Sequence, residues 1–262
     1  MKAYKVLLIL VVFALVLSCS VSCLALTPGG VMKSAIKTSS EQPYTMGVDI
    51  KYSADDPQLN RVFSSLSVDE MKIEVDGENM RIRSETNLGN NGVKIDYILI
   101  SEMIYAKATV TSNGRETTVK KKTSVNDQER AEIIGDVGIS VENDYEYFSD
   151  VSMKKLGDTF VITCTEANED FYETINESIK EATKASGGSA SISDAKMVIK
   201  ISDKKFVSAK MTANIEITVD DEIYTIAMEI GINYDYDSTF EIKKPSDAKD
   251  YEKVRVDEIV GA

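Results

Sequence analysis

Two of the three cysteines of the chain, Cys19 and Cys23, stand four residues apart in the stretch VLSCSVSC, a spacing at which thiols can hold a metal ion or form a disulfide. Histidine is absent from all 262 residues. Zinc sites with histidine ligands and nucleophiles activated by histidine are therefore excluded. The third cysteine, Cys164, lies in the alternating stretch 159–165 and is predicted to be a small buried core residue. No disulfide framework is indicated.

The residues before the cysteine pair indicate export instead of metal chemistry. Lys2 and Lys5 precede an uninterrupted apolar run of 12 residues, 6–17. This run is too short to span a bilayer, which needs about 20 residues, and it fits the apolar region of a secretory signal. Residues 16–19, VLSC, resemble the bacterial lipobox, in which the cysteine is acylated and becomes the new N-terminus. The sequence thus predicts a lipid anchor, with an acyl chain such as palmitate, on Cys19.

Two alternatives to acylation of Cys19 remain open. Residues 20–23, SVSC, form a second lipobox-like segment that would place the acyl group on Cys23. Cleavage near Ala25 without lipidation would make both cysteines incidental. The preferred interpretation divides the chain into a signal peptide at 1–18, a lipidated tether at 19–30 and a single domain at 31–262.

Size and charge limit the function classes. Removal of residues 1–18 would leave 244 residues and, because Lys2 and Lys5 go with them, change the formal net charge from −13 to −15. A chain of this length can bury a full core as one domain. Its acidity argues against nucleic acid as a partner and against broad electrostatic docking onto anionic lipid.

Charged clusters in the mature chain offer little chemistry. Asp235 and Asp237 resemble the start of a calcium loop, but the glycine and distal glutamate of that loop are missing, so solvated turn residues are expected. Residues 220–222 are expected at a hairpin tip. Lys120–Lys122 could approach anionic lipid, although charges that protect a strand edge are favoured. No nucleophile–base pair can be assigned, so the sequence predicts neither an enzyme nor a cofactor or metal site.

Apolar periodicity gives the elements that position these residues. Helical spacing predicts one clear helix with Asn168 as its N-cap and three short helices, and a period of two predicts many strands, the last three of which are unusually long. Residues 137–148 are expected to be a loop, and Ser246 and Asp247 to cap a brief helix around Tyr251. The helices are expected at 31–40, 57–67, 124–136 and 168–185, and the strands at 44–52, 71–75, 80–83, 93–100, 104–111, 116–122, 151–155, 159–165, 195–201, 206–219, 222–237 and 240–244.

The predicted fold class is α+β. Long antiparallel strands with one apolar and one polar face are expected to make a strongly curved sheet whose polar face is solvated and whose apolar face is buried. A doubly wound nucleotide-binding fold is not expected, because there is no glycine-rich phosphate loop and no alternation of strands and helices.

Part of the chain resembles a known family. The hairpin at 151–165, the helix at 168–182 and the later strands, with their segments KISDKK, SAKM and IKKPSDA, are similar to the LolA/LolB and LppX group of bacterial lipoproteins. The similarity is greatest to a branch from Gram-positive bacteria. The resemblance implies a half-open barrel whose concave face is closed by helices and holds a lipid or lipid-linked molecule. The expected lining of that cavity is apolar and adaptable, and comprises Met197, Ile199, Met211, Ile215, Ile226, Met228, Ile230, Phe171 and Ile175.

The same apolar residues also fit an ordinary closed core, and both interpretations stay open. With a cavity, the chain is expected to be a monomeric lipoprotein on the outer face of the cell membrane that binds or transfers a lipid-like ligand. Its own anchor would keep it at the membrane, unlike the periplasmic carriers of the family. With a closed core, a structural or adhesive domain of the cell envelope with protein partners is expected.

Overall fold

The computed structural model describes residues 29–57, 60–61, 68–88, 90–137, 148–183, 189–219 and 222–260. Cys19, Cys23 and the other residues of the predicted signal peptide and tether up to 28 lie outside this part of the chain. So do most of the helix expected at 57–67, the loop at 138–147 and the turn at 220–221.

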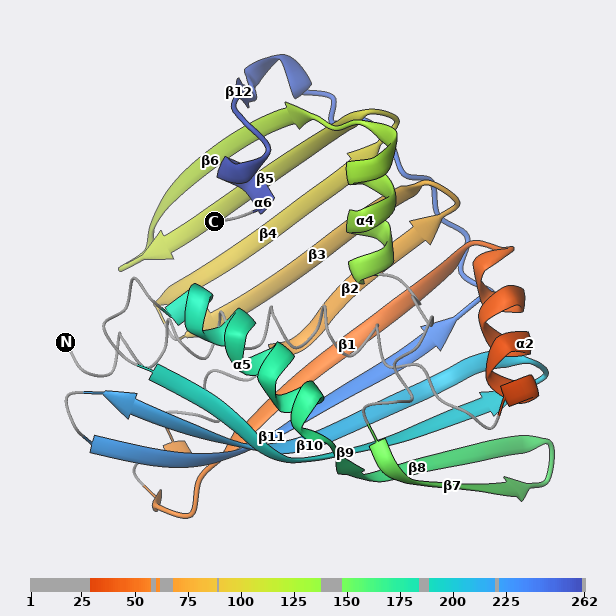
Figure 1. Ribbon diagram of the computed structural model, residues 1–262. Coiled ribbons are helices and arrows are strands. Elements are labelled where there is room, and N and C mark those ends of the chain that lie inside the picture. Colours follow the sequence, from red (N-terminus) through yellow and green to blue (C-terminus); the bar gives the residue numbers. More distant parts are fainter. Residues whose placement is uncertain are drawn as a thin grey trace.

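Twelve strands form one open sheet in the order β12-β6-β5-β4-β3-β2-β1-β11-β10-β9-β8-β7 (Figure 1). All neighbours pair antiparallel except β12 and β6, which pair parallel. The sheet thus joins two meanders, one through β2–β6 and one through β7–β11, on either side of the first strand. The strands are β1 Tyr44–Ser53, β2 Val68–Asp76, β3 Asn79–Leu88, β4 Asn91–Ile100, β5 Met103–Ser112, β6 Arg115–Ser124, β7 Phe148–Leu156, β8 Thr159–Ala167, β9 Ser189–Ser202, β10 Lys205–Val219, β11 Glu222–Asp235 and β12 Glu252–Lys253.

Glycines stand in the turns of three hairpins, β2–β3, β5–β6 and β7–β8. Gly77, Gly114 and Gly157 take φ values of +59°, +76° and +61° at their turns, a region in which glycine carries no steric cost. Asn113 shares the positive φ of Gly114, as the two-residue turn of a hairpin requires.

Among the described residues, four α-helices and one short 3₁₀ helix accompany the sheet. They are α2 Gly29–Ser40, α4 Asp127–Val137, α5 Glu169–Thr183, η3 Ala248–Asp250 and α6 Asp257–Val260. The predicted cap of α5 is confirmed, because Asn168 Oδ1 accepts a hydrogen bond from the backbone N–H of Phe171 at 3.0 Å. Within the described residues, none of the helices combines the length and the apolarity that crossing a bilayer requires.

Helices α2, α4 and α5 lie on one side of the sheet (Figure 1). We call the sheet surface toward them the helix-side face and the opposite surface the outer face. Strand residues alternate between the two. The main core lies on the helix-side face, where Met32 and Ala35 of α2 and Phe171, Ile175 and Ile179 of α5 are buried in one cluster with apolar residues of the strands.

The chain after β11 departs from the prediction. Residues 240–244 form no strand. Phe240 and Ile242 instead pack in a second cluster on the outer face, together with Ile98, Tyr105 and Tyr251. The alternation of Phe240 and Ile242 predicts a strand, but it instead places both side chains against the outer face of the sheet.

Candidate functional site

All nine residues predicted to line a cavity belong to the main core. Seven lie on the helix-side face of β9, β10 and β11, and Phe171 and Ile175 lie on α5. Each is 4% exposed or less: Met197, Ile199, Met211, Ile215, Ile226, Met228, Ile230, Phe171 and Ile175.

The register brings the strand members of this set into rows. Met211 pairs with Met197 on one side and with Ile230 on the other, and Ile230 in turn pairs with Ile50 of β1. Apolar side chains therefore run without interruption across four strands.

Helix α5 is fixed over β9 by two polar contacts. The Tyr172 hydroxyl accepts a hydrogen bond from the backbone N–H of Ala195 at 3.0 Å, and Asn176 Oδ1 accepts one from Ile192 at 2.9 Å. Ala195 lies in a β-bulge, where the register of β9 against β10 shifts, and Ile192 lies just before it. A bulge leaves a residue unpaired in the ladder, and α5 satisfies the N–H of Ala195 there.

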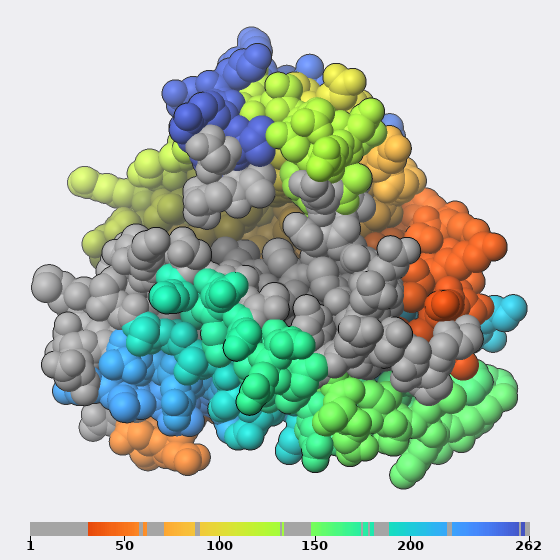
Figure 2. Space-filling view, viewed as in Figure 1, coloured from red at the N-terminus to blue at the C-terminus, as the bar shows by residue number. Residues whose placement is uncertain are grey.

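The apolar surface continues beyond the buried core onto β4, β5 and β6. Val93, Val110 and Val119 are 39%, 46% and 48% exposed. They lie on the helix-side face, since Val93 pairs with Val110 and Val119 pairs with Ala108, at even spacing from the buried Leu99 and Ile104. We call Val93, Val110 and Val119 the valine patch. Figure 2 looks onto this side, with the yellow-green strands at the left, beside the dark blue C-terminal segment.

Sequence reasoning found these three strands but missed the patch. The alternation was visible along 93–100 and 104–111, yet periodicity does not tell how far a covering helix extends along a strand. Exposure at one end of a strand depends on tertiary packing alone.

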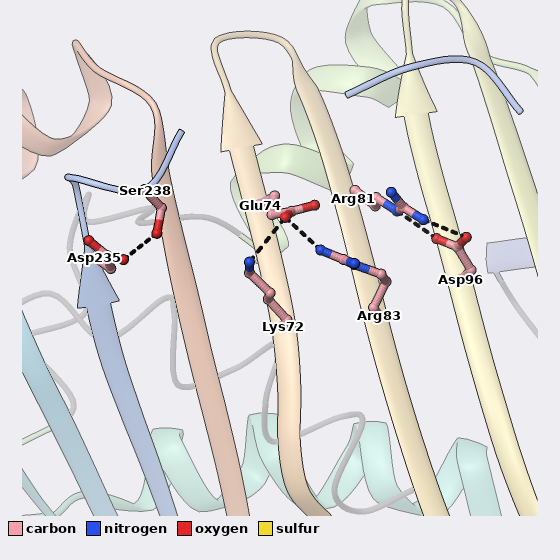
Figure 3. A network of polar contacts seen from close by, with 7 residues as sticks. All are labelled: Lys72, Glu74, Arg81, Arg83, Asp96, Asp235 and Ser238. Atoms are coloured by element: carbon pink, nitrogen blue, oxygen red, sulfur yellow. Dashed lines mark hydrogen bonds and ion pairs between the residues drawn. The ribbon is translucent and has the colours of Figure 1, made fainter. Parts of the chain in front are cut away.

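The outer face is built from charged pairs that cross strands (Figure 3). Glu74 of β2 is only 5% exposed and lies 2.6 Å from Arg83 Nη2 and 3.3 Å from Lys72 Nζ. Arg81 makes two hydrogen bonds of 2.9 Å to the carboxylate of Asp96, which raise the pKa of its guanidinium. These pairs brace β2, β3 and β4 laterally.

Asp235 and Asp237 form a turn, as expected. Asp235 accepts hydrogen bonds from the Ser238 hydroxyl and from the backbone N–H of Asp237, and these bonds lower the pKa of its carboxyl, with the Ser238 bond contributing most. The part of the chain that the structure describes contains no group of three or more His, Cys, Asp or Glu that could hold a metal ion.

Lys120–Lys122 of β6 do more than protect a strand edge. Lys120 Nζ contacts Asp247 at 2.7 Å, and Lys122 Nζ donates to the carbonyl of Ala248 at 2.6 Å. Asp247, expected to cap a brief helix, stands at the N-cap of η3 but makes no side-chain cap bond, because its carboxylate is directed to Lys120. The lysines therefore hold the C-terminal segment against β6.

Cys164 is a buried core residue, as predicted. It is 0% exposed and unpaired. Burial raises the pKa of its thiol to about 12, and the charge of Asp150 adds to the shift. At neutral pH the thiol is therefore protonated and unreactive.

No protein-family model matches the sequence, and no curated protein matches it either.

Proposed function

We propose that this chain is a membrane-anchored extracytoplasmic lipoprotein whose helix-side face forms a half-open barrel and binds a lipid-like molecule. The observation that carries the proposal is the continuity of that face. Buried rows on β1 and β9–β11 continue through Met71 and Ser84 to Ile95, next to the valine patch, which the described helices do not cover. An acyl chain entering at the patch would meet mainly apolar side chains, with Ser84 and Thr86 as the polar groups on its path.

The composition of the face supports an adaptable lining. Seven of the ten methionines of the chain are buried in the main core. Methionine has an unbranched, polarisable side chain that repacks easily around irregular partners. A layer rich in methionine can therefore separate to admit a ligand more easily than one built only of branched residues. The seven are Met32, Met46, Met71, Met80, Met197, Met211 and Met228.

The arrangement of helices supports the same proposal. Helix α5 is joined to β9 by the contacts of Tyr172 and Asn176, whereas in Figure 1 it crosses in front of the sheet without following a strand. A helix fixed at one side of a curved sheet could move as a flap over the opposite side. This is the geometry expected for helices that close the concave face of a half-barrel.

A second function has its own supporting observation. The nine predicted lining residues are almost completely buried, which also suits a closed core in a structural or adhesive domain. In that case the valine patch would be a contact for a protein partner, since exposed apolar surface often marks such contacts.

Lipid content distinguishes the lipid-binding proposal from the closed-core domain. Protein purified from its host membrane is expected to retain a lipid in native mass spectrometry, in addition to any acyl group on its N-terminus. After delipidation it is expected to take up a fluorescent fatty acid. If neither occurs with correctly folded protein, the lipid-binding proposal is wrong and the closed core is favoured.

Variants can locate the site. Val110→Glu is expected to weaken fatty-acid uptake roughly tenfold or more, because a tenfold change needs only about 1.4 kcal/mol and an unpaired carboxylate against an acyl chain costs more. Ile223→Glu is the matched control, since Ile223 is 70% exposed and lies on the outer face of β11. Equal uptake by both variants would exclude entry through the valine patch.

A further inference from the structure

The outer face holds a pocket of about 810 Å³ that the lipid-binding proposal does not use. It lies over β1, β9, β10 and β11, behind the core rows, and one wall comes from the connection that follows β1. Its volume falls within the range of small-molecule sites, about 300–1,000 Å³. Unlike most such sites, it is lined mainly by polar side chains.

Two adjacent rows of the sheet make its floor. In the first row, Lys51 of β1, Glu229 of β11, Thr212 of β10 and Lys196 of β9 stand opposite one another in turn. The second row lies on three of these four strands and runs from Ser53 of β1 through Ala227 of β11 to Asn214 of β10. The small side chains of the second row create the hollow, and the longer ones of the first row supply its polar groups.

The walls are positioned by specific contacts. Asp194 occupies the bulge of β9 with a φ of +52°, and its carboxylate accepts a hydrogen bond from Asn214 Nδ2 at 2.9 Å. On the other side of the pocket, Asn60 Oδ1 accepts from the backbone N–H of Ala54 at 3.1 Å. The pocket is therefore bordered by side chains that are already oriented before any ligand binds.

The charges of the lining balance. Lys51 and Lys196 line it together with Asp194 and Glu229. Two groups outside the lining pair with them, Lys210 with Glu229 at 2.7 Å and Asp49 with Lys51 at 3.5 Å, so the balance is kept. An anion would meet the two carboxylates and a cation the two ammonium groups. A neutral ligand whose groups both donate and accept hydrogen bonds can use lysine, carboxylate, amide and hydroxyl partners together.

From this lining we infer that the pocket binds a neutral polyhydroxylated ligand, that is, a saccharide unit. Each sugar hydroxyl is both donor and acceptor, which matches the mixed row of Lys51, Glu229, Thr212 and Lys196. The described lining offers no aromatic ring on the outer face for stacking, so binding rests on hydrogen bonds and is expected to be weak and selective. The site is on the opposite face of the sheet from the proposed lipid site and is independent of it.

The test uses the full-length protein labelled with ¹⁵N. Maltotriose and triacetylchitotriose, as neutral probes, and glycerol phosphate and choline, as charged probes, are titrated to millimolar concentrations. At least one saccharide is expected to shift the backbone amides of Thr212 and Ala227 and the side-chain amide of Asn214. Absence of these shifts with both saccharides, or tighter binding of either charged probe at the same residues, would overturn the inference.

A pair of variants confirms the location. Ala227→Trp places a large side chain on the exposed floor and is expected to weaken saccharide binding at least tenfold. Asn233→Trp, on the same face of the same strand but outside the pocket, is expected to leave binding unchanged. Because both positions are exposed, neither change should disturb the core, and wild-type dispersion of the remaining resonances verifies folding. Saccharide shifts that persist in Ala227→Trp would place the site elsewhere.

Discussion

The ring of Tyr251 stands edge-on against the ring of Tyr105, with centroids 5.5 Å apart and planes at 86°. The contact joins the C-terminal segment to the outer face of β5. Such edge-to-face pairs contribute beyond their buried area. Around them, Ile98, Ile242 and Ala248 complete the second apolar cluster. The last part of the chain is therefore an integral layer of the fold.

Tyr251→Ala should lower the free energy of unfolding by about 2–4 kcal/mol, since it removes a large side chain that is 6% exposed from this cluster. Urea unfolding monitored by circular dichroism measures the change. Lys249→Ala, at an exposed position of the short helix η3 that ends just before Tyr251, should change the free energy of unfolding by less than about 0.5 kcal/mol. Similar losses in both variants would mean that the helix, and not the ring, holds the segment.

The pair of Lys120 and Asp247 should make stability depend on pH in a defined direction. The hydrogen bond from Lys120 lowers the pKa of Asp247 below 3.8 and raises that of Lys120 above 10.5. Its contribution should therefore be complete between these two values, lost as pH falls through the lowered pKa of Asp247, and lost again as pH rises through the raised pKa of Lys120.

Comparison of the wild type with Lys120→Met at a series of pH values measures this contribution. The difference in free energy of unfolding should be constant near neutrality and shrink at the acid end. Lys200→Met, at an exposed position of β9, serves as the control for removal of one positive charge. A difference that stays constant down to the lowest pH would show that the ion pair contributes nothing.

Arg83→Met should destabilise the protein by about 1–3 kcal/mol, because it leaves the buried carboxylate of Glu74 with one partner less. The matched control is Lys94→Met. Lys94 pairs with Glu85 at 2.9 Å, but both side chains are about half exposed, so its removal should cost less than about 1 kcal/mol. Equal effects of the two changes would refute a special role for burial of Glu74. Thermal and urea unfolding provide the readout.

Cys164 should resist alkylation in the folded protein. Its pKa of about 12 leaves almost no thiolate at neutral pH, and its side chain is inaccessible. Iodoacetamide labelling followed by peptide mass spectrometry should detect modification of Cys164 only in urea, with a midpoint equal to that of unfolding. Labelling at an appreciable rate without denaturant would indicate local opening of β8.

The proposed anchor is tested at the N-terminus. Cys19→Ser should abolish incorporation of labelled palmitate and leave a precursor or a released form, as seen by metabolic labelling and membrane fractionation. Cys23→Ser should leave both unchanged. The reverse result would assign the anchor to Cys23, and labelling in both variants would argue against a lipobox at either position.

The elements that sequence reasoning predicted well are those with long periodic patterns. Strands β9, β10 and β11 alternate over many residues, and α5 carries both an apolar stripe and the Asn168 cap. The placement of Met211 and Ile230 on one face followed from this alternation. Pairing β12 with β6 was not predictable, since two residues, Glu252 and Lys253, carry no periodic signal.

The candidate sites likewise depend on contacts that leave no periodic signal in the sequence. Sequence placed the apolar residues on one face, but the exposure of Val110 depends on where a distant helix ends. The outer pocket depends on register, because Lys51, Glu229, Thr212 and Lys196 come from four separate strands. The contact of Lys120 with Asp247 joins residues that are 127 positions apart, a distance over which no local pattern carries information.

The central position of β1 has a consequence for how the chain folds. The first strand pairs on one side with β2, its neighbour in sequence, and on the other with β11, which is the last long strand to be made. The two meanders can each begin to form, but they join only after β11 is present. Such high contact order slows folding. Until then, the apolar side of β1 and one of its edges stay unpartnered. The growing chain therefore needs protection from aggregation until synthesis is nearly complete.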